Sequence, residues 1–128
     1  MLTKIIKNRF SSLFTWGETS LGWCRPVTPS LRDPRPVPDF PDVKKVSTSL
    51  FHLAFITNDN LVYTAGLGED FRLGLNSEKT VEAPTRLVFE GLGNAKIVDV
   101  KCGVRHNLAL ADDGSVYQWG YIPQVEPD

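Results

Sequence analysis

Short apolar runs separated by turn-forming residues make up most of the chain. Residues 96–101 alternate polar and apolar positions with one extra apolar residue, and residues 107–110 form a short apolar run. Such patterns predict β-strands, because successive side chains of a strand point to opposite faces of its sheet. No window of twelve or more residues beyond the N-terminus has a strong helical period. We therefore expect an all-β fold.

Two turn sequences indicate how these strands connect. Residues 112–114 are Asp-Asp-Gly and stand between two strand-like runs, so that Gly114 can supply the positive φ of a tight hairpin. Residues 58–60 are Asn-Asp-Asn and stand in the same setting, with Asn60 in the place of the glycine. Asparagine is the next best residue for that conformation. Both sites are predicted to be hairpin turns.

The chain contains an internal repeat. Residues 51–66 align without a gap on residues 105–120, at an offset of 54 positions. The matched pairs include His52 with His106, Asp59 with Asp113, Val62 with Val116, Tyr63 with Tyr117 and Gly66 with Gly120. An earlier copy of the last strand is Leu13–Gly17. Strand-rich units of about 50 residues are typical of propeller blades or a similar β array.

The connections between the repeated segments differ in length. Six of the nine prolines lie between Pro26 and Pro41, which disfavours a regular helix or a central strand there. We expect that segment to be an extended surface loop. The unequal loops at residues 25–43 and 75–93 are the places where partner contacts are expected.

Composition narrows the classes of protein that fit. The chain has 128 residues, a net charge of −1, 41% hydrophobic and 23% charged residues, as one soluble globular domain does. These values exclude a disordered tail, a collagen-like chain and a heavily basic nucleic-acid binder. No stretch reaches the roughly 18–20 apolar residues of a transmembrane helix. There is no direct signal for nucleic acid.

The N-terminal residues 1–12 form a basic leader. They contain Lys4, Lys7 and Arg9 and no acidic residue, a composition typical of a short mitochondrial presequence and also of a solvated leader. Cys24 and Cys102 are too few for a secreted disulfide scaffold and indicate a reduced compartment. We expect an intracellular protein, cytoplasmic or nuclear, with the mitochondrion as the alternative.

The second repeat copy carries a recognisable motif. It reads Gly103-Val104-Arg105-His106, then Leu-Ala-Leu at 108–110, then Asp-Gly-Ser-Val-Tyr-Gln-Trp-Gly at 113–120. This resembles the repeat of the regulator of chromosome condensation (RCC1) family. The first copy has Ala65 where the tryptophan is usual. The resemblance covers residues 13–120, in units of about 13–66 and 67–120, followed by a tail at 121–128.

The resemblance implies a closed propeller of seven blades, of which about two RCC1-like repeats are present here. Two blades cannot close a ring, and we expect a partial propeller with open ends. Three explanations are open. The chain is a fragment or truncated isoform, it assembles with copies of itself or another propeller subunit, or it is a degenerate module within a larger complex. Each of them calls for further blades or a protein partner.

The repeated polar residues are predicted to be structural. His52 and His106 occupy one repeat position, where a buried imidazole can hydrogen-bond the backbone and hold a turn. Equivalent roles in turns and at strand ends are expected for Asp59, Asp113, Gly66 and Gly120. The chain offers no cluster of metal ligands, no phosphate loop and no nucleophile motif. We therefore predict no catalytic, metal or cofactor site.

Function is predicted from this absence together with the repeat. The favoured hypothesis is a non-enzymatic protein-interaction or scaffold module. Trp23, which lies outside the strand pattern, is the candidate interface residue. The alternative is guanine-nucleotide exchange on a small GTPase, which the family resemblance alone implies.

Overall fold

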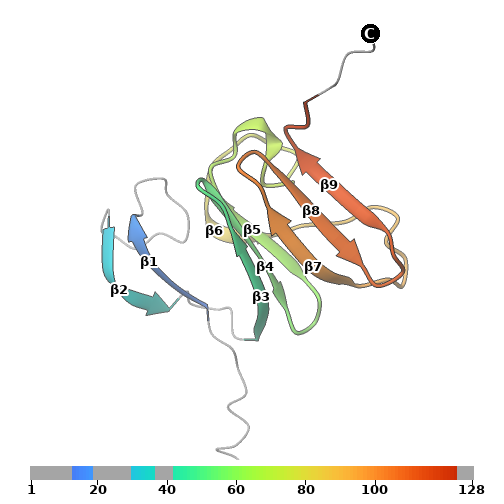
Figure 1. Cartoon of the computed structure of the whole chain (residues 1–128), viewed down its shortest axis with the longest axis horizontal. Coiled ribbons are helices and arrows are strands. Elements are labelled where there is room, and N and C mark those ends of the chain that lie inside the picture. Colours follow the sequence, from blue (N-terminus) through green and yellow to red (C-terminus); the bar gives the residue numbers. More distant parts are fainter. Residues whose placement is uncertain (1–12, 19–29, 37–41, 124–128) are drawn as a thin grey trace, which may run out of the picture.

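The computed structural model describes residues 13–18, 30–36 and 42–123. These ranges form nine β-strands and one short 3-10 helix (Figure 1). The strands are β1 (Phe14–Glu18), β2 (Ser30–Pro36), β3 (Val43–Thr48), β4 (His52–Thr57), β5 (Val62–Gly66), β6 (Val81–Arg86), β7 (Ile97–Cys102), β8 (His106–Ala111) and β9 (Val116–Gly120), and the helix η2 (Glu69–Phe71) follows β5. The predicted leader at 1–12 and Trp23 lie outside the described residues.

The strands form three antiparallel sheets that follow one another along the chain. A two-stranded sheet pairs β1 with β2, a four-stranded sheet has the order β3-β4-β5-β6, and a three-stranded sheet has the order β7-β8-β9. Figure 1 shows them side by side, with the four-stranded sheet in the middle. The predicted all-β fold is confirmed.

Strand register repeats with the same offset as the sequence. Each residue pair between β3 and β4 recurs 54 residues later between β7 and β8, and the pairs of β4 with β5 recur between β8 and β9. The two predicted hairpin turns recur as well, with Asn60 at φ 62° and Gly114 at φ 88°. The sequence repeat is therefore a repeat of strand pairing, and the predicted turns are confirmed.

Glycine is required at the end of the third strand of each repeat. Gly66 and Gly120 have φ values of 125° and 98°, a region that residues with a side chain rarely adopt. A Cβ atom on Gly66 would lie 2.5 Å from the carbonyl oxygen of Phe51, and one on Gly120 would lie 2.4 Å from that of Arg105. The close approach of the neighbouring strand excludes any larger residue.

Strand β4 is buried on both faces and connects two apolar clusters. Ala54 and Ile56 face the three-stranded sheet, in a cluster with Val62, Leu87, Ile97, Val100, Ala109 and Ala111. Leu53 and Phe55 belong to a second cluster with Leu13, Val43 and Ala65. Burial of an isoleucine or phenylalanine side chain contributes about 1.5–3 kcal/mol. The middle sheet thus packs against the three-stranded sheet on one face, and Leu13, just before β1, packs on the other.

The proline-rich segment differs in part from its predicted loop conformation. Residues Ser30–Pro36 form β2, although they contain Pro34 and Pro36. Among the residues that the structure describes, this strand pairs only with β1, and the register shifts between Thr15 and Gly17. Proline is tolerated in such an edge strand because one side of the strand needs no backbone donors. The prediction of a loop is wrong for these seven residues.

The sheets are out of phase with the repeat units at 13–66 and 67–120. Strand β6, in the second unit, completes the sheet whose other three strands lie in the first unit. The four-stranded sheet begins at Val43 and the three-stranded sheet at Ile97. Each of these sheets therefore begins about 30 residues after the start of the corresponding repeat unit.

Candidate functional site: an inter-sheet polar network and an uncovered sheet face

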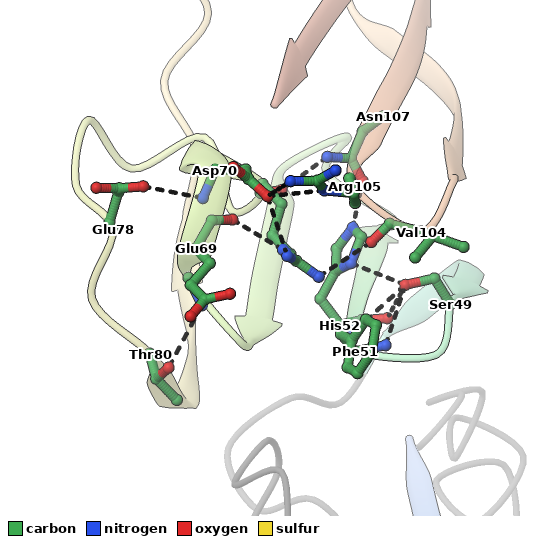
Figure 2. A network of polar contacts seen from close by, with 12 residues as sticks. Ser49, Phe51, His52, Glu69, Asp70, Glu78, Thr80, Val104, Arg105 and Asn107 are labelled. Atoms are coloured by element: carbon green, nitrogen blue, oxygen red, sulfur yellow. Dashed lines mark hydrogen bonds and ion pairs between the residues drawn. The ribbon is translucent and has the colours of Figure 1, made fainter. Parts of the chain in front are cut away.

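A polar network joins the four-stranded sheet to the three-stranded sheet (Figure 2). Its centre is His52, the first residue of β4, whose side chain is fully buried. The imidazole Nδ1 lies 2.8 Å from the hydroxyl of Ser49, and Nε2 lies 2.5 Å from the Oδ1 of Asn107 on β8. The amide of Asn107 in turn donates to the carbonyl oxygen of Arg72 at 2.7 Å.

These contacts indicate which ring nitrogen of His52 carries the proton. Because the Asn107 nitrogen donates to a carbonyl, its oxygen faces the imidazole, and Nε2 carries the proton that this oxygen accepts. Nδ1 is then free to accept from the hydroxyl of Ser49. Burial lowers the pKa of His52, with the positive charge of Arg72 adding to the effect and the Asn107 bond opposing it. The imidazole connects Ser49 to Asn107 of the neighbouring sheet.

Arg72 is the second centre of the network and is also almost completely buried. Its guanidinium donates to the carbonyl oxygens of Glu69, at 2.8 Å, and Val104, at 3.1 Å, and lies 3.4 Å from a carboxylate oxygen of Asp70. The same oxygen of Asp70 accepts from Arg105 at 2.8 Å. A buried charge is costly unless it is paired and hydrogen-bonded, and these contacts meet that requirement.

The equivalent histidine of the second repeat has a different environment. The side chain of His106 is exposed, whereas that of His52 is buried by Asn107 and the loop around Arg72. The expectation of a buried imidazole is therefore wrong for His106. The physical reason is that His52 faces a following sheet, and in the described part of the chain no sheet follows the one that contains His106.

The three-stranded sheet presents an apolar face to solvent. Leu108, Leu110 and Val116 are 42%, 42% and 63% exposed. We call these three residues the uncovered face. An open hollow of about 240 Å³ lies over it, lined by residues of β7, β8 and β9.

The residues at the same repeat positions as the uncovered face are buried in the four-stranded sheet. The residues of the uncovered face lie 54 positions after Ala54, Ile56 and Val62, which are 0%, 0% and 2% exposed because they pack on the three-stranded sheet. The same face of the same repeated hairpin is thus a core in one sheet and a surface in the next.

The remaining predicted structural positions lie in turns. Asp59 and Asp113 are exposed at the two hairpin turns, far along the chain from each other. The carboxylate of Asp113 accepts the backbone N–H of Ser115 at 2.9 Å, and this bond lowers the pKa of Asp113. Neither aspartate belongs to the inter-sheet network.

Cys102 is a free thiol that packs between sheets. Its Sγ lies 3.5 Å from the carbonyl oxygen of Ser47, and burial raises its pKa to about 11. A thiol with such a pKa is protonated at neutral pH and is a poor nucleophile.

Residues 13–18, 30–36 and 42–123 hold no group of three or more His, Cys, Asp or Glu side chains that could bind a metal ion. No helix among them has the length and apolarity to cross a membrane.

Sequence reasoning missed most of the network, namely Ser49, Asp70, Arg72 and Asn107. Asn107 stands directly after His106, but its repeat equivalent is Leu53, so the alignment gave no reason to select it. Asp70 and Arg72 lie in the connection after β5, and the corresponding residues after Gly17 are Leu21 and Trp23, so the repeat gave no reason to select them. The only available signal was an arginine within an otherwise apolar stretch, Phe71–Leu75.

Two antiparallel sheets that follow one another along the chain, built on the same hairpin and packed face to face, define a repeat protein of the β-propeller type. Comparison with known proteins names the family. Residues 59–110 match the regulator of chromosome condensation (RCC1) repeat. The chain belongs to the RCC1 repeat family and covers part of a propeller.

Solved propellers of this family superpose on the chain. Human WBSCR16 has a TM-score of 0.73 at 29% identity, over 84% of this chain and 28% of that one. Prp20p from Saccharomyces cerevisiae has a TM-score of 0.73 at 28% identity, over 86% and 26%. The predicted partial propeller is therefore confirmed.

Curated relatives are much longer than this chain. The human E3 ubiquitin-protein ligase HERC2 is 34% identical over 118 residues, which are 89% of this chain and 2% of that protein. The X-linked retinitis pigmentosa GTPase regulator homolog of Caenorhabditis elegans is 41% identical over 79 residues, 62% of this chain and 6% of that protein. The RCC1 repeats thus occur in large proteins of varied function.

Proposed function

We propose that the chain is a non-enzymatic scaffold module that binds a protein partner through the uncovered face. The observation that carries this proposal is the exposure of Leu108, Leu110 and Val116 at positions that are buried between sheets one repeat earlier. The occupant that fits best is a further β-sheet with small and aliphatic side chains. The corresponding cluster inside the molecule consists of Ile97, Val100, Ala109 and Ala111.

The polar residues around the uncovered face support the same kind of partner. His106 stands beside that face as His52 stands beside the buried one, and His52 binds an amide oxygen of the following sheet. A partner sheet with an amide side chain opposite His106 would repeat this contact. Prp20p, which has a similar structure, has been solved in complex with Kap60, a protein partner.

A photoreactive amino acid tests the proposal. Placed at Leu110 of the full chain in its native cells, it should form covalent adducts with a protein partner, and Leu108→Lys in the same chain should abolish them. The control position is Val88, an aliphatic residue that is 82% exposed and lies away from the uncovered face. Equal adduct formation at positions 110 and 88 would contradict the proposal.

Guanine-nucleotide exchange, the alternative prediction, is separated from the scaffold role by one assay. Release of labelled GDP from small GTPases is measured with and without the chain. A scaffold module leaves the rate unchanged, whereas an exchange factor increases it.

A further inference from the structure

The contacts between the four-stranded and the three-stranded sheet are of two kinds. The larger part is apolar, and Ala54 and Ile56 of β4 share one cluster with Ala109 and Ala111 of β8. Aliphatic cores accept other arrangements of similar volume at little cost, so that a unique structure is lost before stability is. Apolar packing therefore holds the two sheets together but selects weakly among the ways in which they can be offset.

The second kind of contact is the buried pair of His52 and Asn107 (Figure 2). Both side chains are fully buried, and the 2.5 Å contact between Nε2 and Oδ1 joins the first residue of β4 to the second residue of β8. One residue of a strand measures about 3.3 Å. Displacement of one sheet along the other by that length breaks this hydrogen bond and leaves a buried donor and acceptor unpaired, which is costly. The pair is thus satisfied in one arrangement of the sheets.

Other polar contacts between these two sheets discriminate less between arrangements. Lys45 and Asp99 approach to 3.6 Å, but their side chains are 49% and 35% exposed, so water replaces the contact when it is broken. The backbone N–H of Cys102 donates to the hydroxyl of Ser47 at 2.9 Å, where both residues are partly buried. A polar group that is fully buried has no water to replace a lost partner. The energetic difference between the native and a displaced arrangement is therefore concentrated in the buried pair.

The repeat shows that an amide is not required at this strand position. The repeat equivalent of Asn107 is Leu53, which lies in an apolar cluster with Leu13 and Phe55. A leucine therefore fits this position of the strand where no histidine faces it. The amide of Asn107 is an alternative to apolar packing, present where it meets the imidazole of His52.

The surroundings of the pair stay satisfied when both of its members are removed. The carbonyl oxygen of Arg72 accepts from the amide of Asn107 and also from the indole Nε1 of Trp119, at 3.2 Å. The hydroxyl of Ser49 lies 3.2 Å from the carbonyl oxygen of His52, to which it can donate instead of to Nδ1. Replacement of both members of a buried polar pair by apolar side chains is often nearly neutral for stability. The pair can thus be exchanged for an apolar one without leaving these neighbours unpaired.

We propose that the pair of His52 and Asn107 determines specificity within the molecule: it selects a single arrangement of the two sheets and contributes little net stability. An apolar pair at the same positions would hold the sheets together equally well but would allow more than one offset. Single polar residues in otherwise apolar interfaces fix register in this way. The proposal concerns the interior of the molecule and is independent of what binds the uncovered face.

Thermal unfolding of double variants tests the part of the proposal that concerns stability. His52→Leu/Asn107→Leu should unfold within a few degrees of the wild type, whereas each single substitution should lower the midpoint, because it leaves the other member buried and unpaired. A second double variant, His52→Val/Asn107→Val, covers the case in which two leucines are too large for the site. The proposal is overturned if both double variants unfold at or below the midpoint of the less stable single variant.

The arrangement of the sheets is measured as the distance between two spin labels. The labels are attached to cysteines that replace the exposed residues Thr85 of β6 and Gln118 of β9, with Cys24→Ser in every chain. Cys102 is kept, because burial raises its pKa to about 11 and makes its thiol a poor nucleophile. The wild type should give one narrow distribution of distances. A double variant that folds should show a second maximum displaced by about 3–7 Å, the length of one or two residues of a strand.

Thr64→Val is the matched control for loss of a buried hydrogen bond. Thr64 is fully buried, and its hydroxyl donates at 2.7 Å to the carbonyl oxygen of Leu73 in the connection that follows the same sheet. The variant should lower the unfolding midpoint and keep the single narrow distribution, because this hydrogen bond does not join the two sheets. A single narrow distribution in the folded double variants would overturn the proposal. A second maximum in Thr64→Val would also overturn it, since the effect would then not be specific to the pair.

Discussion

At the scale of single residues, two histidines at equivalent positions of the repeat have different environments. His52 is buried and hydrogen-bonded on both ring nitrogens, whereas His106 is exposed. The repeat therefore predicted a shared role but could not predict burial, because burial depends on what packs next to each sheet. Asn107 illustrates the same limit, since it closes the network opposite His52 although its repeat equivalent is a leucine.

This difference predicts unequal effects of one substitution at the two sites. His52→Gln should lower the free energy of unfolding by about 1–3 kcal/mol, because Asn107 loses a buried partner. His106→Gln should change it by less than about 0.5 kcal/mol, as an exposed substitution does. Urea unfolding of both variants measures these values, and equal losses would contradict the assignment of roles.

The lowered pKa of His52 also predicts how stability depends on pH. Below its ordinary pKa of 6.5 the unfolded chain binds a proton that the folded chain resists, so the folded state is destabilised as the pH falls. At pH above 6.5 the imidazole is neutral in both states and the effect is absent. Unfolding at pH 7.5 and 5.5 should show a loss in the wild type that is smaller in His52→Gln, and His106→Gln should behave as the wild type.

At the scale of the elements, the repeated hairpin was predictable because its signals are local. The turns at Asn60 and Gly114 and the glycines that end β5 and β9 each follow from conformations that few residues adopt. The strand at Ser30–Pro36 was not predictable in this way. Its prolines argue against a strand, and only pairing with β1, a non-local contact, explains it.

The glycine that ends β5 offers a test of this close strand approach. Gly66→Ala should cost at least about 2 kcal/mol, because positive φ and contact with the Phe51 carbonyl both oppose a side chain. Gly91→Ala is the matched control, since Gly91 has φ 71° but no atom within 4 Å of an added Cβ. Gly91→Ala should lower the free energy of unfolding by only about 1 kcal/mol, because it introduces a residue at positive φ without a close contact. Equal losses in thermal unfolding would show that the close contact is unimportant.

At the scale of the whole molecule, the sheets depend on each other. Ile56 and Val62 of the four-stranded sheet share a cluster with Ile97 and Ala109 of the three-stranded sheet. Neither sheet has a core of its own on that side. The sequence indicated a repeat array and open ends, but which end would expose an apolar face depended on the direction in which successive sheets pack.

Shared packing predicts that the two sheets unfold together. Ile97→Ala, at a position 1% exposed, should lower the free energy of unfolding by about 2–5 kcal/mol. Hydrogen exchange should then accelerate to the same extent in β4 and β8. Val88→Ala, at an exposed site, should change neither. Acceleration confined to β8 would mean that the sheets are independent.

The phase difference between sheets and repeat units has a consequence for how such a chain can change in length. Strand β6 ties the four-stranded sheet to the sequence of the following repeat, so the 54-residue window 43–96 contains that whole sheet. Tandem duplication of such a window inside the chain would add a sheet and leave every existing strand pairing in register. An insertion of any other length within a strand would shift the pairing and break a sheet. The fold can therefore grow or shrink by genetic steps of one repeat.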